Sequence, residues 1–198
     1  MDAVLGDAIG RAAFRRLFRT GRAVSIEELA SDLGRPVEEV GAAVVELEGA
    51  VRIRLDAGGR VMGAAGLNVE PDRHRIEIAG RGFWTWCARD LLGILGALRA
   101  DGVGRSVSPW SRTPLEVRFR HGRPGPGSLV VFRPDDAHRE RCRNLYLDRC
   151  SNSNLFESRE ATEAWSRRQG MPGCLLGLAE AAPLAAARWA PLAEGLGR

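Results

Sequence analysis

Apolar residues recur at helical spacing through the first fifty positions of the chain. In residues 3–19 they lie four apart and predict an amphipathic helix, with one face formed by Leu5, Ile9, Ala13 and Leu17. Ser25 and Glu28 then occupy the positions of a capping box, and Gly34 ends the helix that they begin. A third helix is predicted from about 36 to 48, because proline suits a first turn and valines follow at helical spacing.

Two alternating segments, VRIRLD and GRVMGAAG, follow the third helix and predict a hairpin that turns at residues 56–59. Helices followed by a hairpin form the order of a winged helix-turn-helix. We therefore expect residues 1–66 to form a winged-helix-like N-terminal module. DNA binding would use the third helix, which carries four glutamates and only Arg35 at its start. Such a face repels phosphates and offers nothing for base readout, so the pattern favours a packing or dimerisation module.

The remaining chain alternates between strand and helix patterns. Residues 67–78 predict two strands, 83–98 a buried helix, and the segments PLEVRFR and SLVVFRP two further strands. A helix capped near Ser158 follows, and then a short buried strand and a helix that is interrupted or restarted at Pro183. The fold class is therefore α+β, with the N-terminal module packed on a mixed α/β domain that has a small sheet and spans residues 67–198.

Composition and charge narrow the class of protein. The 198 residues carry a net charge of +4, and the basic side chains are arginines. This balance fits nucleic acid or anionic metabolites equally well. The chain has no long apolar run and no export signal, so we expect a cytoplasmic protein that does not enter a membrane. Its four cysteines should then be reduced thiols, and no Cys/His cluster predicts a zinc site.

The segment Trp86-Cys87-Ala88-Arg89-Asp90 carries the clearest candidate chemistry. On a helix, Cys87 and Asp90 share a face, so the thiol and the carboxylate can meet. A carboxylate raises the pKa of a neighbouring thiol, which is unhelpful for a simple nucleophile. The pair suits a site where a soft metal takes the sulfur while the carboxylate handles the proton. Taken alone, the pattern favours a buried core cysteine beside a helix-capping aspartate.

A family resemblance changes this balance. The run FWTWCARDLLGILGAL resembles the active-site helix of the organomercurial lyases, also called alkylmercury lyases. Cys150 stands fifteen residues before Trp165, and this spacing and the following AWSRRQG are similar to a second landmark of that family. The stretch VSIEELASDLGRPVEEV is similar to the family's N-terminal domain. The resemblance covers roughly residues 20–185.

The resemblance implies a carbon–mercury lyase that cleaves R–Hg⁺ by protonolysis to R–H and Hg(II). It implies that Cys87 captures mercury first, that Cys150 is the second thiolate, and that Asp90 protonates the departing carbanion. Soft sulfur ligands match a soft metal ion, and a nearby carboxyl group supplies the acid. Trp86 matches an aromatic position that contacts the organic group or the metal, or else only fills the core. No cofactor is implied, and the expected Hg(II) acceptors are thiols or a mercuric reductase.

Five residues depart from the family pattern or have no matched role. Ser151 and Asn152 follow the second cysteine, and Trp110 stands in a loop where a further cysteine is common in the family; these three positions bear on substrate range. Cys174 is expected in the core, and Cys142 is expected to be a surface thiol.

Two other functions remain open. One is a relative of the same fold that binds a soft metal or performs other thiol chemistry without turnover. The other is a winged-helix regulator whose cysteines sense a metal or an oxidant. The acid beside the thiols favours the enzyme, because binding alone does not need it. The enzyme further requires that Cys87 and Cys150 face each other across a pocket.

Overall fold

A computed structural model describes residues 2–142 and 144–196. Three helices open the chain, α1 (Ala3–Thr20), α2 (Ile26–Leu33) and α3 (Val37–Gly49). Their ends follow local signals, as predicted. The Ser25 side chain accepts from the backbone of Glu28 and the Glu28 side chain accepts from that of Ser25, and Gly34 ends α2 with a positive φ of 61°. The N-terminal helices are therefore determined largely by their own sequences.

A large antiparallel sheet follows, and it is wider than the small sheet that the sequence predicts. Its eight strands lie in the order β1 (Ile53–Leu55), β2 (Val61–Ala64), β3 (Leu67–Asn68), β5 (Arg81–Thr85), β4 (His74–Ile78), β6 (Gly102–Val107), β7 (Pro114–Arg120) and β8 (Arg123–Pro124). The hairpin β1–β2 joins this sheet directly, since Gly63 pairs with Asn68 and Ala64 with Leu67. The sheet thus runs across position 66, and the division at that point and the winged-helix assignment remain predictions.

The predicted helix over residues 83–98 is wrong at its start. Residues 81–85 form β5, with Phe83 and Thr85 buried on one face of the sheet, and α4 (Ala88–Ala97) begins only after Cys87. The aromatic and β-branched run FWTW suits a pleated strand better than a helix, and Ile76 of β4 pairs with Phe83 to confirm it. Cys87 is therefore the N-cap residue of α4, with extended backbone dihedrals of −152° and 168°.

Helix α7 (Leu178–Ala193) packs closely on α4 and runs through Pro183 without interruption, contrary to the expected break. Pro183 lies on the exposed side of the helix, whereas Ala182, Ala185 and Trp189 are buried. A Cβ atom added to Gly93 of α4 would lie 2.3 Å from the Trp189 ring, so this close approach needs glycine. Tertiary packing of the buried face holds a helix that proline alone would break.

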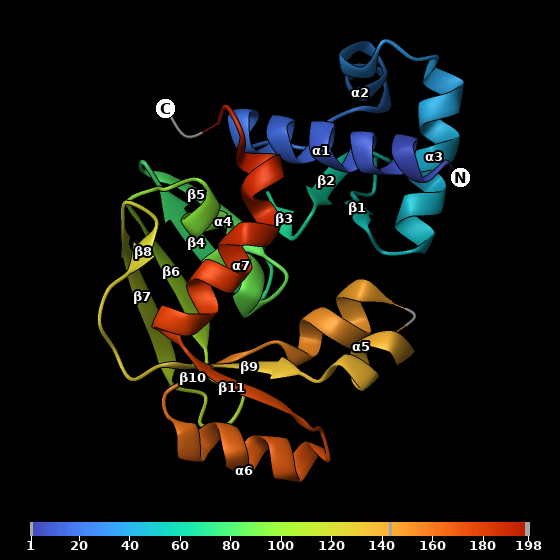
Figure 1. Ribbon diagram of the computed structural model, residues 1–198. Coiled ribbons are helices and arrows are strands. Elements are labelled where there is room, and N and C mark those ends of the chain that lie inside the picture. The colour runs from blue at the N-terminus through green and yellow to red at the C-terminus, as the bar shows by residue number, and fades with distance from the viewer. Residues whose placement is uncertain (1, 143, 197–198) are drawn as a thin grey trace.

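A second, three-stranded sheet lies below the first in Figure 1, in the order β10 (Leu155–Phe156), β9 (Val130–Pro134) and β11 (Gly173–Gly177). Helix α6 (Arg159–Gln169) covers it and begins at the predicted cap Ser158. Between β9 and β10 lie α5 (Asp136–Arg141), a π-helical turn (Leu145–Arg149) and a 3-10 turn (Cys150–Asn152). Strand β11 is only partly buried, and Cys174 on it is exposed rather than in the core. Among the described residues, no helix is long and apolar enough to cross a membrane.

Candidate active site

Cys87 lies in the short connection between β5 of the large sheet and α4. The backbone N–H of Trp86 donates to the carbonyl of Gly66 at 3.1 Å, and that of Ala88 donates to the carbonyl of Ser153 at 3.0 Å. The Thr85 hydroxyl donates to the Cys87 carbonyl at 3.3 Å. These bonds hold the cysteine backbone from three directions, and the thiol itself is buried.

Asp90 is the third residue of α4 and is 5% exposed. The sequence predicted that Asp90 and Cys87 share one face of a helix. In the structure Cys87 is instead the N-cap residue and Asp90 the third residue of α4, and these two positions also bring side chains together. Gly66 lies directly against it, since an added Cβ would come within 2.4 Å of the carboxyl carbon and the backbone φ there is 85°. A glycine in another strand connection therefore makes room for the buried acid.

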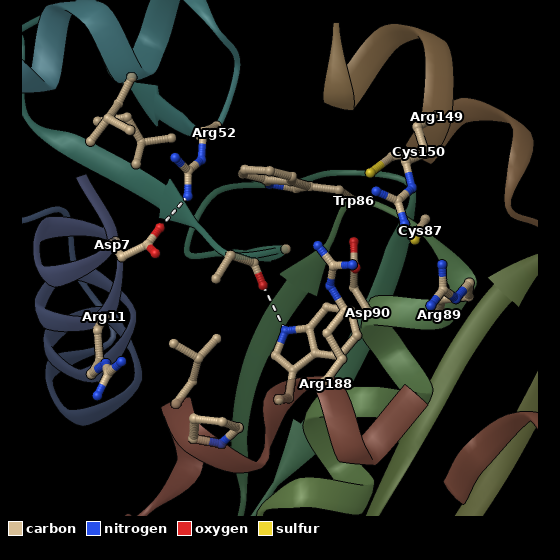
Figure 2. Close-up of a pocket in the computed structure, with 18 of the residues that line it drawn as sticks. Asp7, Arg11, Arg52, Trp86, Cys87, Arg89, Asp90, Arg149, Cys150 and Arg188 are labelled. Carbon is tan, nitrogen blue, oxygen red and sulfur yellow. Dashed lines mark hydrogen bonds and ion pairs between the residues drawn. The ribbon is translucent and has the colours of Figure 1, made fainter. Parts of the chain in front are cut away.

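Cys150 reaches this site from the other side, at the start of the 3-10 turn. One ligand atom each from Cys87, Asp90 and Cys150 lies within 4.8 Å of the others, and all three residues are buried. Figure 2 shows both sulfurs and the carboxyl group beside one pocket. The prediction that the two distant cysteines face each other is confirmed.

Burial sets the protonation of this cluster. It raises the pKa of the Cys87 thiol well above its usual value, and the neighbouring Cys150 raises it further. Burial likewise raises the pKa of Asp90 well above the usual carboxyl range, with Cys87 adding to the effect, while Arg89 and Arg188 act in the opposite direction. Without a metal, burial therefore favours the protonated forms of the Cys87 thiol and of the Asp90 carboxyl group.

The pocket has a volume of about 360 Å³ and is closed by residues from several parts of the chain. Helix α1, the Arg52–Ile53 segment and the end of α7 form the side away from the cluster. The Trp86 indole lies in the pocket wall, where its buried Nε1 has no hydrogen-bond partner among the described residues. One carboxyl oxygen of Asp90 also has no hydrogen-bond partner among the described residues. A donor and an acid are thus available to a bound molecule.

Tyr146, the only tyrosine, was not singled out from the sequence. Its ring meets Trp86 edge-on with centroids 5.8 Å apart, and it packs against the small cluster that Trp86 forms with Cys87 and Cys150. Its hydroxyl donates to Asp72 at 2.8 Å, and the side chain of Asp72 is only 2% exposed and pairs with Arg54 at 2.6 Å. The signal in the sequence was that the chain has one tyrosine and that it stands four residues before Cys150. Tyr146 ties the segment that carries Cys150 to the connection between β3 and β4 of the large sheet.

The departures from the family pattern lie outside the pocket wall. Ser151 and Asn152 are not among its lining residues; the side chains of both bond to carbonyls of the preceding π-helical turn. Trp110 is 41% exposed and is likewise not a lining residue. Cys142 is half-buried and donates to the His138 carbonyl at 3.2 Å.

Two buried thiols and one buried carboxylic acid define a class of protein that handles a soft metal ion beside a proton donor. Comparisons with known proteins make the class specific. The family model described as alkylmercury lyase matches residues 67–190. Relatives named alkylmercury lyase are 31% identical over 159 residues in Staphylococcus epidermidis and 32% identical over 155 residues in Bacillus cereus. The chain belongs to the alkylmercury lyase family.

These alignments cover 76% and 73% of this chain and 68% and 65% of the two relatives, so the chain spans about two thirds of their length. The crystal structure of the mercury-bound form of MerB2 is similar in fold, with a TM-score of 0.80. It covers 96% of this chain and 98% of its own at 22% identity, which shows a shared fold.

Proposed function

We propose that this protein cleaves the carbon–mercury bond of R–Hg⁺ by protonolysis, with Cys87, Cys150 and Asp90 as its catalytic residues. The single observation that carries the proposal is the buried cluster of these three residues, whose ligand atoms lie within 4.8 Å of one another. Membership of the family supports the substrate class, and the geometry of the cluster supports the roles.

Capture of mercury exchanges protons for metal. Cys87, fixed at the start of α4, takes the mercury of R–Hg⁺ first, and its thiol proton passes to the displaced ligand of mercury or to solvent, because the thiolate is the metal ligand. Cys150 then binds from the opposite wall and releases its proton to solvent. Two thiolates raise the electron density at mercury and weaken its bond to carbon.

Protonation completes the reaction. Asp90 donates its proton to the carbon as the carbon–mercury bond breaks, so R–H forms and Hg(II) stays on the two thiolates. The Asp90 carboxylate left behind regains a proton from the next incoming thiol. The raised pKa of Asp90 favours the protonated form of the acid, which is the form that can donate.

Trp86 is proposed to contact the organic group. Its side chain is 1% exposed overall and forms part of the pocket wall beside the two cysteines. A flat apolar ring next to the reacting carbon also keeps water from the site.

The remaining expectations are proposals of the same kind. The exposed face of α3 carries Glu38, Glu46 and Glu48, which supports weak and unselective DNA binding. Small thiols or a mercuric reductase are the proposed Hg(II) acceptors. Free cysteines in the site suit a reducing compartment such as the cytoplasm.

The test measures, by gas chromatography, the release of benzene from phenylmercury in excess thiol. Wild type should release benzene over many turnovers, and Cys174→Ser, which changes an exposed cysteine far from the cluster, should match it. Stoichiometric binding of phenylmercury without benzene would contradict the proposal and favour a soft-metal binder of the same fold.

A further inference from the structure

The pocket beside the cluster is lined by an unusual number of arginines. Its charged lining consists of Arg11, Arg52, Arg89, Arg149 and Arg188 together with Asp7 and Asp90. Asp7 is already paired with Arg52 at 2.6 Å, and Asp90 is the buried acid. The pocket therefore presents a positive field to whatever enters it.

The arginines come from separate elements and meet only in the folded chain. Arg89 lies in the first turn of α4, Arg149 directly precedes Cys150, and Arg188 projects from α7. Figure 2 shows their guanidinium groups around the cluster of the two cysteines and Asp90, with Arg11 and Arg52 on the far side of the pocket. The cationic lining thus extends from the reacting atoms to the pocket wall opposite.

Arg11, Arg89 and Arg188 have no acidic partner among the described residues, and the last two lie beside the cluster. Within residues 2–142 and 144–196, no carboxylate lies within ion-pair distance of Arg89 or Arg188. Arg89 is half-buried, and Arg188 rests over the Trp189 ring at 5.8 Å. The buried indole N–H of Trp86 also lacks a partner in this part of the chain. Converging unpaired donors are the pattern of an anion subsite.

The pocket is larger than a simple organic group requires. A cavity of about 150 Å³ is enough to hold benzene, whereas this pocket measures about 360 Å³. Space therefore remains beside the organic group for a second substituent on mercury. Because mercury prefers sulfur, R–Hg⁺ among free thiols exists as the adduct R–Hg–SR′.

Resting on the proposed function, we propose that the arginines of this pocket bind a carboxylate of the mercury substrate, carried on its thiol ligand or on its organic group. The subsite selects anionic mercury compounds over neutral and cationic ones. In the capture step R–Hg–SR′ and the Cys87 thiol exchange to give Cys87–S–Hg–R and R′SH, with the proton passing from one sulfur to the other. Arg89 and Arg188 hold the carboxylate while this exchange occurs.

The experiment compares kcat/KM for benzene release from phenylmercury adducts of mercaptoacetate, mercaptoethanol and cysteamine, which are anionic, neutral and cationic. A separate arm uses para-carboxyphenylmercury with mercaptoethanol, which moves the carboxylate to the organic group. An anionic adduct should exceed the neutral one by roughly tenfold, as for a hydrogen-bonded charge. The arm that shows the preference identifies which substituent carries the carboxylate.

Thiols differ in their intrinsic affinity for mercury, so the decisive quantity is the ratio of anionic to neutral kcat/KM in variants. Arg188→Gln, on an exposed helix face, should lower this ratio severalfold, and Arg188→Lys should retain most of it. Arg120→Gln removes an equal charge from the exposed face of β7, outside the pocket, and should leave the ratio at the wild-type value.

An unchanged ratio in both Arg188→Gln and Arg89→Gln would overturn the subsite while leaving the lyase intact. Failure of the proposed function is distinguishable, because wild type would then release no hydrocarbon from any adduct. Rising salt should reduce the wild-type preference, since screening weakens an accessible charge pair.

Discussion

The two walls of the site are built in opposite ways. Cys87 and Asp90 stand at the junction of β5 and α4. Helix α4 belongs to the main hydrophobic core through residues such as Leu91 and Leu92, and α7 packs over it. Cys150 begins a 3-10 turn that directly follows a π-helical turn, outside the regular strands. Polar ties hold that second wall, including the Tyr146–Asp72 bond and the bond between the Ala88 N–H and the Ser153 carbonyl.

This difference matches a division of labour. The first wall keeps one thiol and the acid at a constant separation, as proton transfer to carbon requires. The second wall brings a ligand whose backbone is irregular and can adjust as mercury changes its coordination, and π-helical turns are frequent at such functional sites. In the proposed mechanism, the first wall supplies the acid and the second wall completes the metal site.

Removing either thiol should abolish activity, whichever wall carries it. Cys87→Ser and Cys150→Ser should both abolish benzene release, because a serine hydroxyl is a hard, barely ionised ligand for mercury. Turnover assays with phenylmercury measure this, and Cys174→Ser is the control at an exposed position. Substantial turnover by Cys150→Ser would show that the irregular wall only covers the site.

A methyl group at Gly66 tests the rigidity of the first wall. Gly66→Ala adds a backbone penalty at positive φ and forces the Asp90 carboxyl to move, which should cost about 2–4 kcal/mol of unfolding free energy. Denaturant unfolding measures the loss, and benzene release should fall with it. Gly59→Ala has a similar φ of 75° and nothing within 4 Å, so it carries the backbone penalty alone. Equal losses at the two glycines would remove the packing argument.

Loosening the second wall should have a milder effect. Tyr146→Phe keeps the ring against Trp86 and deletes the hydroxyl that bonds Asp72. One such bond contributes about 1 kcal/mol, so Hg(II) affinity should fall roughly fivefold. Competition with a chelating dithiol measures that affinity, while the alkylation rate of Cys87 should not change. A loss confined to Cys87 reactivity would assign Tyr146 to the first wall instead.

The pH dependence of the reaction separates the proposed roles of Cys87 and Asp90 without any amino-acid substitution. Capture needs a thiolate, and burial raises the pKa of Cys87, so kcat/KM should rise with pH at its lower limb. Release of R–H needs the protonated carboxyl, so the rate should fall as pH rises through the raised pKa of Asp90. Stopped-flow capture and single-turnover release separate the limbs. Release that accelerates at high pH would contradict an acid role.

Local signals in the sequence predicted much of the fold. The capping box at Ser25, the cap at Ser158 and the alternation of PLEVRFR correspond to observed elements because each depends on neighbouring residues. The helix start before Cys87 and the break at Pro183 were wrong, because pairing with β4 and packing on α4 overrode local preference.

The sequence likewise predicted only part of the site. Cys87, Asp90 and Cys150 were identified because the family resemblance joins distant segments. Tyr146 and the arginine lining were not, since Arg89 and Arg188 meet only where α7 crosses α4. The spacing of residues along the chain does not predict where two helices cross.

The most direct test replaces the acid and keeps both thiols. Asp90→Asn should still capture phenylmercury, visible by mass spectrometry as a protein-bound adduct, while single-turnover benzene release slows about 10²–10⁴-fold. The accumulated adduct combined with slow release would establish Asp90 as the proton donor to carbon. Benzene release by Asp90→Asn at the wild-type rate would show that the proton comes from another group and would contradict the proposed mechanism.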